Sequence, residues 1–503
     1  MAEQTGKATG KRRGWSSGSS PEHGEEGREM GTDNSESRHR SKSAKLTPRM
    51  TAVSSTATPV YRCVGAPPPC VKRLQTMDFG APFRDLFVLK HSLGTAYLNH
   101  GSFGATPKVV LGKLRMLNTQ LEEHPDQWFR RTVVPMVRQS AAELAKFVLA
   151  DKSELVFVEN ATTGINAVIR SLELHDNDGV LCFSLHYRPI LTTLRRTCEY
   201  KQEVIDLIEM DIPYPFPAPQ ELVDMVELEL KRSPHIQLAV FDHITSPTSL
   251  VLPVKALCEV CHNHGVEVLV DGAHAPGQIP LSLSELNADY YVGTCHKWLF
   301  SPKGSAFLWA RREVQNLLCP LVTTTGWDSD FVDSFSHQGT RNATAFACVA
   351  TALRMYNFMG VERVMKRNRE MVIEMAQHLA TLWGTQTMLP YNAPEQAGGK
   401  GNNDESEDDF SGAPTSYEGA FMACIELPPQ LALNFLNCGD QHDMQCDRLR
   451  DLLLSRFNLE ASVIFYFQTK MWVRISCQVY NVKADYERLG EAIATLTGEV
   501  DTV

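Results

Sequence analysis

A lysine and an aspartate that each follow an apolar, strand-like run are the residues of this chain that point most clearly to a chemical reaction. The run 266–270 ends at Asp271, and the run 290–293 is followed by Lys297. A lysine amine can form a Schiff base with an aldehyde, and a carboxylate can keep a pyridine nitrogen protonated so that the ring accepts electrons. A surface lysine after a core strand is the alternative interpretation, and it would be favoured for the lysine alone because lysine is seldom buried, but the surrounding pattern makes it the weaker one. The pair therefore predicts pyridoxal 5'-phosphate (PLP) chemistry.

The segments around these two residues alternate between short apolar runs and helical patterns. Such alternation predicts an α/β domain on a mostly parallel sheet, which we expect to span residues 76–345. From 346 to 503 the pattern changes to a long helical stretch, 345–383, and then to shorter strands, which predicts a smaller α+β domain. The expected strands are 155–158, 179–184, 237–242, 266–270, 290–293, 306–309, 420–427 and 471–476, and expected helices include 163–174 and 221–231.

Two segments have a composition that does not favour a packed core. Residues 1–50 are rich in Ser, Gly and charged side chains, with Trp15 as their sole aromatic residue, so we expect 1–75 to be a disordered tail. The stretch 51–77 has basic residues and no acid, which would suit an organelle transit segment if translation began at Met50. The acidic, low-complexity stretch 391–418 is expected to be a disordered insert in the smaller domain.

Composition excludes several classes of function. The 503 residues carry a formal net charge of -10, which argues against a nucleic-acid partner, and we find no apolar run long enough to span a membrane. The 13 cysteines are scattered, which favours reduced thiols in a cytoplasmic protein, with a mitochondrial location as the alternative if translation starts at Met50. The pattern Cys258-x-x-Cys261-His262 could bind haem or metal, but it reads as a helix that stops at Gly265, so no metal is expected.

A family resemblance rests on three motifs. These are the opening segment Tyr97-Leu-Asn-His-Gly-Ser-Phe-Gly-Ala-Thr-Pro107, the Asp271-Gly-Ala-His274 strand end and the Thr294-Cys-His-Lys297 segment. Together they resemble the class V aminotransferase family of PLP-dependent enzymes, in its branch of isopenicillin N epimerases, cysteine desulfhydrases and hercynylcysteine sulfoxide lyases. The resemblance runs from about residue 79 to 495. It implies the PLP-dependent transferase fold type I, with a seven-stranded-type sheet in the large domain, and a homodimer.

The resemblance also implies where the cofactor phosphate binds. Residues 160–164 lie between a predicted strand and a predicted helix, where convergent N–H groups and the helix dipole favour an anion. Ala161, Thr162 and Thr163 are the implied phosphate cup, although Asn or Thr can equally serve there as a plain helix cap. Further phosphate contacts are implied for Thr294 and His296 of the same subunit and for Thr340 of the neighbouring subunit.

The remaining implied contacts concern the cofactor ring. Asp271 is expected to pair with the pyridine nitrogen, His274 to contact the phenolic oxygen, and Tyr187 to cover the ring face, although a tyrosine after a strand can also be ordinary packing. Thr245 or Ser246 is a further candidate for the phenolic oxygen.

Recognition of an amino-acid substrate is expected to use an arginine. Arg474 matches the family's carboxylate-binding position, and a guanidinium is the natural partner of a carboxylate. A surface ion pair is the alternative for an arginine in a strand. Asn99 and His100 are expected to line the same mouth. Arg130 could bind a distal acidic group, but a solvated helix face is equally compatible with its position.

These residues predict removal of the substrate α-proton, with the freed amine of Lys297 as the base and Asp271 and His274 as the other catalytic residues. The fate of the carbanion then separates a lyase, an epimerase and an aminotransferase. The stretch 321–346 has no cysteine, which argues against persulfide transfer. We expect a C–S lyase, of the cysteine desulfhydrase or hercynylcysteine sulfoxide lyase kind, that gives pyruvate and ammonia by β-elimination. A non-catalytic interaction scaffold is a remote alternative, since a scaffold needs no Schiff-base lysine.

Overall fold

The computed structural model describes residues 74–90, 94–200, 205–326, 328–389, 419–431, 442–461 and 464–499. All of them belong to one compact unit that spans 57–503. The predictions for the tail, for the transit segment after Met50 and for the acidic insert lie outside the described residues, apart from 74–77. Within the described ranges, none of the helices combines the length and apolar character that a bilayer-spanning segment needs.

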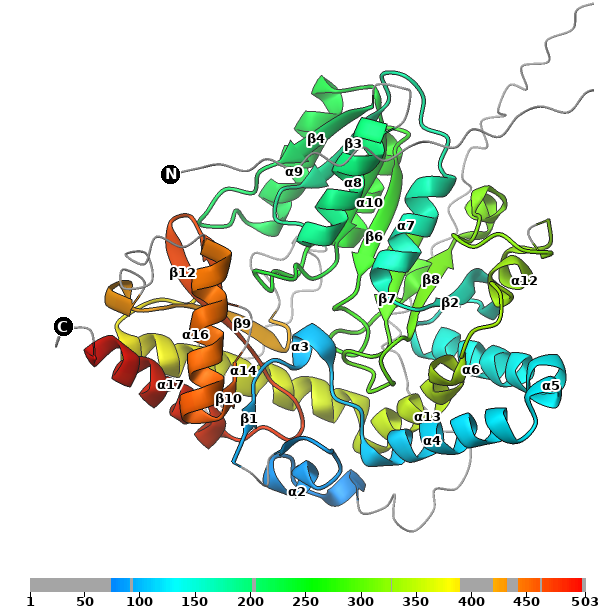
Figure 1. Ribbon diagram of the computed structural model, residues 1–503. Coiled ribbons are helices and arrows are strands. Elements are labelled where there is room, and N and C mark those ends of the chain that lie inside the picture. Colours follow the sequence, from blue (N-terminus) through cyan, green and yellow to red (C-terminus); the bar gives the residue numbers. More distant parts are fainter. Residues whose placement is uncertain are drawn as a thin grey trace, which may run out of the picture. The chain divides into compact units, whose positions relative to one another are not determined.

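A seven-stranded sheet forms the centre of the structure (Figure 1). Its order is β2-β8-β7-β6-β5-β3-β4, and β8 runs antiparallel to both of its neighbours while the other pairs are parallel. The mostly parallel sheet and the fold class predicted from the sequence are thereby confirmed. The strands are β2 (Leu155–Val158), β3 (Gly179–Phe183), β4 (Asp206–Met210), β5 (Ile236–Asp242), β6 (Glu267–Gly272), β7 (Tyr290–Thr294) and β8 (Ala306–Ala310).

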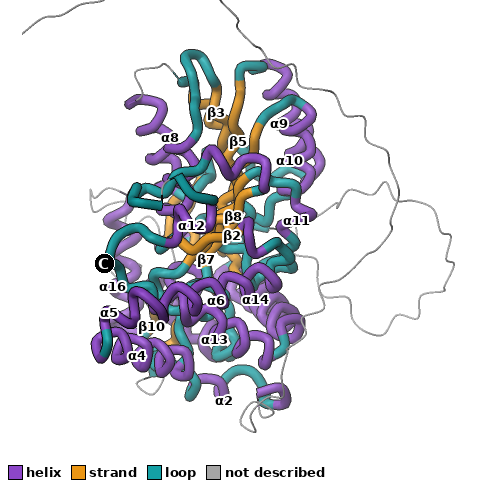
Figure 2. Tube along the Cα trace, turned by 90° about the vertical axis from the view of Figure 1, so that its right-hand side faces the viewer, coloured by secondary structure: helices purple, strands orange, loops and turns teal. Residues whose placement is uncertain are grey.

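Helices cover both faces of this sheet, with the strands between them in Figure 2. Successive strand residues enter different cores: Val180 and Cys182 pack with α7 (Ala161–Ser171) and α8 (Arg188–Tyr200), whereas Leu181 and Phe183 pack with α9 (Pro219–Arg232) and α10 (Val254–Asn263). A sheet that is buried on both faces needs apolar residues at every position, which explains the continuous apolar runs in the sequence. The other elements of this region are α4 (Lys108–Glu123), α5 (Pro125–Gln127), the π-helix 128–132, α6 (Val133–Phe147), α11 (Leu283–Leu286), α12 (Phe331–Ser336), α13 (Thr344–Met359) and the 3-10 turns 152–154 and 312–317.

A second, smaller core surrounds the three-stranded antiparallel sheet β11-β12-β9. Its strands are β9 (Met422–Glu426), β11 (Ile464–Phe467) and β12 (Lys470–Ser476), and its helices are α14 (Val361–Trp383), α16 (His442–Phe457) and α17 (Lys483–Gly498). The predicted helical stretch 345–383 is two helices, because Gly360 takes a positive φ of 84° and ends α13. The division into domains at 345 stays a prediction.

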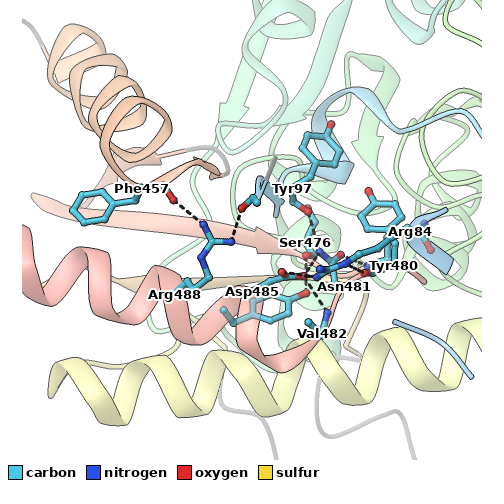
Figure 3. Close-up of polar contacts among 12 residues, drawn as sticks. Arg84, Tyr97, Phe457, Ser476, Tyr480, Asn481, Val482, Asp485 and Arg488 are labelled. Carbon is cyan, nitrogen blue, oxygen red and sulfur yellow. Dashed lines mark hydrogen bonds and ion pairs between the residues drawn. The ribbon is translucent and has the colours of Figure 1, made fainter. Parts of the chain in front are cut away.

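The segment that opens the described chain packs on both cores: Phe83 and Phe87 belong to the core of the large sheet, and Ala96 and Leu98 belong to the smaller core. It contains α2 (Ala81–Arg84), β1 (Ala96–Tyr97) and α3 (His100–Phe103), and β1 pairs in parallel with β10 (Leu459–Glu460). Figure 3 shows the polar contacts that fasten it: the Arg84 guanidinium donates to both carboxylate oxygens of Asp485, at 2.7 and 2.8 Å. Arg488 donates to the carbonyls of Gly94 and Phe457.

Candidate active site

Two adjoining cavities open at the carboxyl ends of strands β5, β6 and β7, the edge at which ligands bind in open α/β sheets. The inner cavity has a volume of about 210 Å³ and the outer one about 850 Å³. Nine residues predicted from the sequence line the inner cavity together: Ala161, Thr162, Tyr187, Ser246, Asp271, His274, Thr294, His296 and Lys297. Six residues line both cavities: Ser102, Phe103, Tyr187, Ser246, His274 and Lys297.

Lys297 is half-buried, and its Nζ lies 3.1 Å from Nε2 of His274. Burial lowers the pKa of Lys297 to about 8, and the nearby Arg474 also lowers it, while Asp271 acts in the opposite direction. The pKa of His274 is lowered well below its usual value, mainly by burial, so its ring is neutral at neutral pH.

The partners of His274 define which of its nitrogens carries the proton. The Trp298 indole N–H, which can only donate, lies 3.4 Å from Nδ1. Nδ1 must therefore accept, and the proton of the neutral ring belongs on Nε2, facing Lys297. A hydrogen bond from Nε2–H to Nζ requires a neutral lysine amine, which agrees with the lowered pKa of Lys297.

Asp271 ends β6 inside the inner cavity and is 3% exposed. One carboxylate oxygen accepts the backbone N–H of Ala273 at 2.9 Å. Burial raises the pKa of Asp271, and the Ala273 N–H and Lys297 oppose that rise. A second carboxylate, Asp242, lies beside it, because Asp242 and Asp271 are paired positions at the ends of the parallel strands β5 and β6.

The N-terminus of α7 also lines the inner cavity, through Asn160, Ala161 and Thr162. Asn160 caps this helix, since its side-chain oxygen accepts the Thr163 N–H at 2.9 Å. The cap uses the N–H of Thr163, whose side chain is not among those that line the cavity, while Ala161 and Thr162 do line it. This end offers N–H groups and the positive end of a helix dipole to an anion.

His296 and Thr294 are fixed by hydrogen bonds to the main chain. Nδ1 of His296 donates to the carbonyl of Ser305 at 2.8 Å, which leaves Nε2 as an acceptor when the ring is neutral. Burial lowers the pKa of His296 to about 4. The Thr294 hydroxyl donates to the carbonyl of Ala273. Both side chains are thereby held in the cavity wall.

Tyr187 and Ser246 lie where the two cavities adjoin. Tyr187 is 44% exposed and lines both cavities. Ser246 also lines both, and its carbonyl accepts a hydrogen bond from Nη1 of Arg474. The predicted contact of Ser246 with a cofactor oxygen stays a prediction.

Arg474 lies in β12 and is 1% exposed. Nη2 donates to the Ser102 hydroxyl at 3.2 Å, and Nε has no hydrogen-bond partner among the described residues. Burial lowers the pKa of Arg474 to about 10, which leaves it charged at neutral pH. Ser102 and Ser246, its two contacts, both line the cavities, so the cation is placed just behind their wall.

Asn99 and His100 have different positions. Asn99 lines the outer cavity, where its side-chain oxygen accepts the Ser102 hydroxyl at 2.7 Å. His100 is fully buried and is not among the lining residues of either cavity. Its Nε2 lies 2.9 Å from the carbonyl of Lys297, and its Nδ1 lies 2.8 Å from the Tyr480 hydroxyl. In this position His100 holds the main chain of the lysine.

Gly104 of the opening motif lies close to the main chain of the turn that carries His296 and Lys297, here called the lysine turn. Gly104 has a φ of 68°, and a Cβ atom there would lie 1.9 Å from the carbonyl oxygen of His296. The N-terminal segment can therefore reach the lysine turn only with glycine at this position.

Thr340 is exposed and is not among the lining residues of either cavity. It was predicted to act from the neighbouring subunit, and that contribution, like the homodimer, stays a prediction.

Several lining residues were not predicted as site residues. In the inner cavity these are Ser102, Phe103, Asn160, Asp242 and Ala273, and in the outer cavity they include His186, Cys446, Asp447, Arg450, Phe465 and Phe467. Asp242 could have been found from the sequence, since it ends a strand as Asp271 does. The residues of α16 and β11 carry no such signal, because only the tertiary packing brings them to the cavity.

The donor set fits a phosphorylated pyridine aldehyde. A lysine whose lowered pKa makes the neutral amine accessible can react with the aldehyde, Asp271 can pair with a protonated ring nitrogen, and the α7 N-terminus with Thr294 and His296 can bind the phosphate. These groups lie around one cavity.

Comparisons with known proteins agree with this assignment. Residues 126–399 match the family described as Aminotransferase class-V. A probable chloroplastic L-cysteine desulfhydrase of Arabidopsis thaliana is 29% identical over 429 residues, which cover 80% of this chain and 83% of the relative. Isopenicillin N epimerase of Amycolatopsis lactamdurans is 26% identical over 417 residues, covering 80% and 94%.

Among solved structures, a complex of the cystine C-S lyase C-DES with its product cysteine persulfide superimposes with a TM-score of 0.62. The sequence identity is 18%, over 81% of this chain and 98% of that one. This likeness is one of fold. Since the family match alone covers more than half of the sequence, this chain belongs to the class V aminotransferase family, whose enzymes depend on PLP and act on amino acids.

Proposed function

We propose that this protein is a PLP-dependent C–S lyase that acts on cysteine or an S-substituted cysteine and releases pyruvate and ammonia. The observation that carries the proposal is the contact between the amine of Lys297 and His274, two residues that line both cavities. The relatives named L-cysteine desulfhydrase, which are 27–29% identical over 80% or more of this chain in two plants, support sulfur as the leaving group.

PLP is held, in this proposal, by Asp271 at the ring nitrogen, by Tyr187 over the ring face, and by the α7 N-terminus at the phosphate. When bound, PLP supplies an electron sink for the electron pair left at the substrate α-carbon. The chain's own groups bind, orient and move protons around it.

Lys297 is the proposed base for the α-proton. A pKa of about 8 leaves a useful fraction of neutral amine near neutral pH, whereas an ordinary lysine is almost fully protonated there. His274, with its proton on Nε2, donates to the Nζ lone pair in the resting site, and that bond is released when the lone pair takes the α-proton. The proton taken from carbon can then be returned to the departing sulfur, either by Lys297 or by solvent.

Arg474 is the proposed partner of the substrate carboxylate. Its cation is buried behind Ser102 and Ser246, and its Nε lacks a partner among the described residues. Since a buried guanidinium favours bonds to an anion, rotation of the Ser102 hydroxyl would open the site to a carboxylate. The outer cavity leaves room beyond Lys297 for a substituent on sulfur.

Elimination is favoured over persulfide transfer by the position of the cysteines. Cys446 lines the outer cavity, but it lies within α16 and is 3% exposed. Transfer requires a thiolate that reaches the substrate sulfur. In β-elimination the Cβ–S bond breaks with its electron pair on sulfur, and water then releases pyruvate and ammonia.

The test is product analysis with purified protein. L-Cysteine, cysteine S-conjugates, hercynylcysteine sulfoxide and β-chloro-L-alanine are each incubated with enzyme, and pyruvate, ammonia and the sulfur product are measured. Equal amounts of pyruvate and ammonia from a sulfur substrate are expected. Alanine in place of pyruvate, lost in Cys446→Ala, would identify a desulfurase.

Epimerisation is the second candidate, because relatives named isopenicillin N epimerase match 80% of the chain. Exchange of the α-proton with solvent and inversion of configuration, without any pyruvate, would replace the lyase assignment with an epimerase.

A further inference from the structure

A second carboxylate lies in the inner cavity beside Asp271. Asp242 and Asp271 are paired positions of neighbouring strands, each is 3% exposed, and both line the cavity. One carboxylate is enough to pair with a ring nitrogen. Two buried carboxylates side by side do not both ionise readily, because each negative charge disfavours the other. The structure therefore requires a role for Asp242 that differs from that of Asp271.

Asp242 has two partners on the loop after β3. Oδ2 of Asp242 lies 3.2 Å from Nδ1 of His186, and the backbone N–H of Tyr187 donates to the Asp242 carboxyl group. The His186 side chain is fully buried, and neither of its ring nitrogens makes a hydrogen bond among the described residues, so Asp242 is the polar group that lies within reach of Nδ1. Asp242 thus lies against the buried histidine and accepts from the main chain of the residue that faces the cavity.

The surroundings favour a neutral pair. Burial lowers the pKa of His186 to about 3, and burial together with Asp271 raises that of Asp242 well above its usual value. The charged groups nearest to Asp242 are Asp271, which opposes its ionisation, and Lys297, which favours it. A proton kept on Asp242 can be donated to Nδ1 of His186, and Asp271 then remains the charged member of the two carboxylates.

We infer that the His186–Asp242 pair is a positioning unit: it holds Tyr187 at the cavity and leaves Asp271 as the single charged carboxylate for the cofactor nitrogen. The inference rests on the cofactor placement in the proposed function, but not on the leaving group. It assigns different roles to two aspartates that the sequence presents as equivalent strand ends.

The test compares amide and alanine substitutions on the full-length protein loaded with PLP. An amide copies the shape and hydrogen bonds of a protonated carboxyl group. In Asp242→Asn the pH midpoint of the bound cofactor's absorbance change is therefore expected to stay within about 0.3 units of the wild type. The matched variant Asp271→Asn removes a charge next to the ring, and we expect its midpoint to move by roughly two units.

The positioning of Tyr187 is measured separately, by the circular dichroism of the bound cofactor and by PLP affinity. Asp242→Ala removes both contacts, so we expect a changed dichroism signal and about 10-fold weaker PLP binding, whereas Asp242→Asn restores both. If Asp242→Ala does not fold in thermal melts, His186→Phe is measured instead, and its dichroism is expected to change while the absorbance midpoint does not move.

Two results would overturn the inference. An absorbance midpoint in Asp242→Asn that moves as far as in Asp271→Asn would mean that both carboxylates are charged. Wild-type dichroism and PLP affinity in both Asp242→Ala and His186→Phe would exclude a positioning role. If the wild-type protein does not bind PLP, the proposed function itself fails, and that outcome is distinct from either of these.

Discussion

The lowered pKa of Lys297 can be tested through substitutions that move it in opposite directions. Burial is its main cause, Asp271 raises the pKa and Arg474 lowers it. The change from 10.5 to about 8 corresponds to about 3 kcal/mol, or roughly 300-fold more neutral amine at pH 7 than an ordinary lysine has. Asp271→Asn should therefore lower the pKa of Lys297 further, and Arg474→Gln should raise it.

The assay is pH-dependent covalent labelling of the cofactor-free protein. An amine-reactive reagent is applied from pH 6 to pH 11, and the modified peptide that contains Lys297 is quantified by mass spectrometry, with the exposed Lys152 in the same digest as reference. Labelling of the wild type should rise to half of its maximum near pH 8. A midpoint at 10 or above, or shifts of the same sign in both variants, would refute the electrostatic account of the site.

Three further predictions concern the lysine, the arginine and a glycine. Lys297→Ala should lose turnover, and borohydride should fix the cofactor covalently in the wild type but not in this variant. Arg474→Gln should raise KM for an amino-acid substrate about 10- to 100-fold in steady-state kinetics, because a hydrogen bond to a charged group contributes about 1.5–3 kcal/mol; an unchanged KM would remove Arg474 from substrate binding. Gly104→Ala should lower the free energy of unfolding by more than about 1 kcal/mol, since its Cβ would clash with the carbonyl of His296 at a positive φ. Gly112→Ala, in α4, places its added methyl group more than 4 Å from any atom beyond the adjoining residues and backbone of its own helix, and should be neutral or stabilising in the same thermal melts.

Much of the large domain was predictable because burial on both faces of a parallel sheet leaves long apolar runs in the sequence. The ends of those runs give the positions of Asp271 and Lys297, and a parallel sheet brings such ends to one edge. Sequence reasoning was weaker where a residue's neighbour depends on strand register. Asp242 and Asp271 are 29 positions apart, and only the pairing of β5 with β6 places them side by side.

Contacts between distant segments were the hardest to foresee. His100 was expected at the substrate mouth from the family resemblance of the opening motif, yet the structure places it in the core, between Tyr480 and the carbonyl of Lys297. No local sequence pattern distinguishes a histidine at the substrate mouth from a histidine in the core. The residues of α16 and β11 that line the outer cavity were equally hard to foresee. They reach the cavity only through packing with segments hundreds of residues away in the sequence.

The N-terminal segment joins the smaller core to the reactive lysine. It is fastened to that core through Arg84 and Asp485 (Figure 3), and a few residues later it contacts the lysine turn through His100 and Gly104. Arg474 reaches the same cavities from the smaller core through Ser102 of this segment. A disturbance of the Arg84–Asp485 contact should therefore reach both the proposed carboxylate partner and the main chain of Lys297, although neither charged residue lines a cavity. The smaller core is, on this argument, part of the apparatus that positions the lysine as well as the part that supplies the arginine.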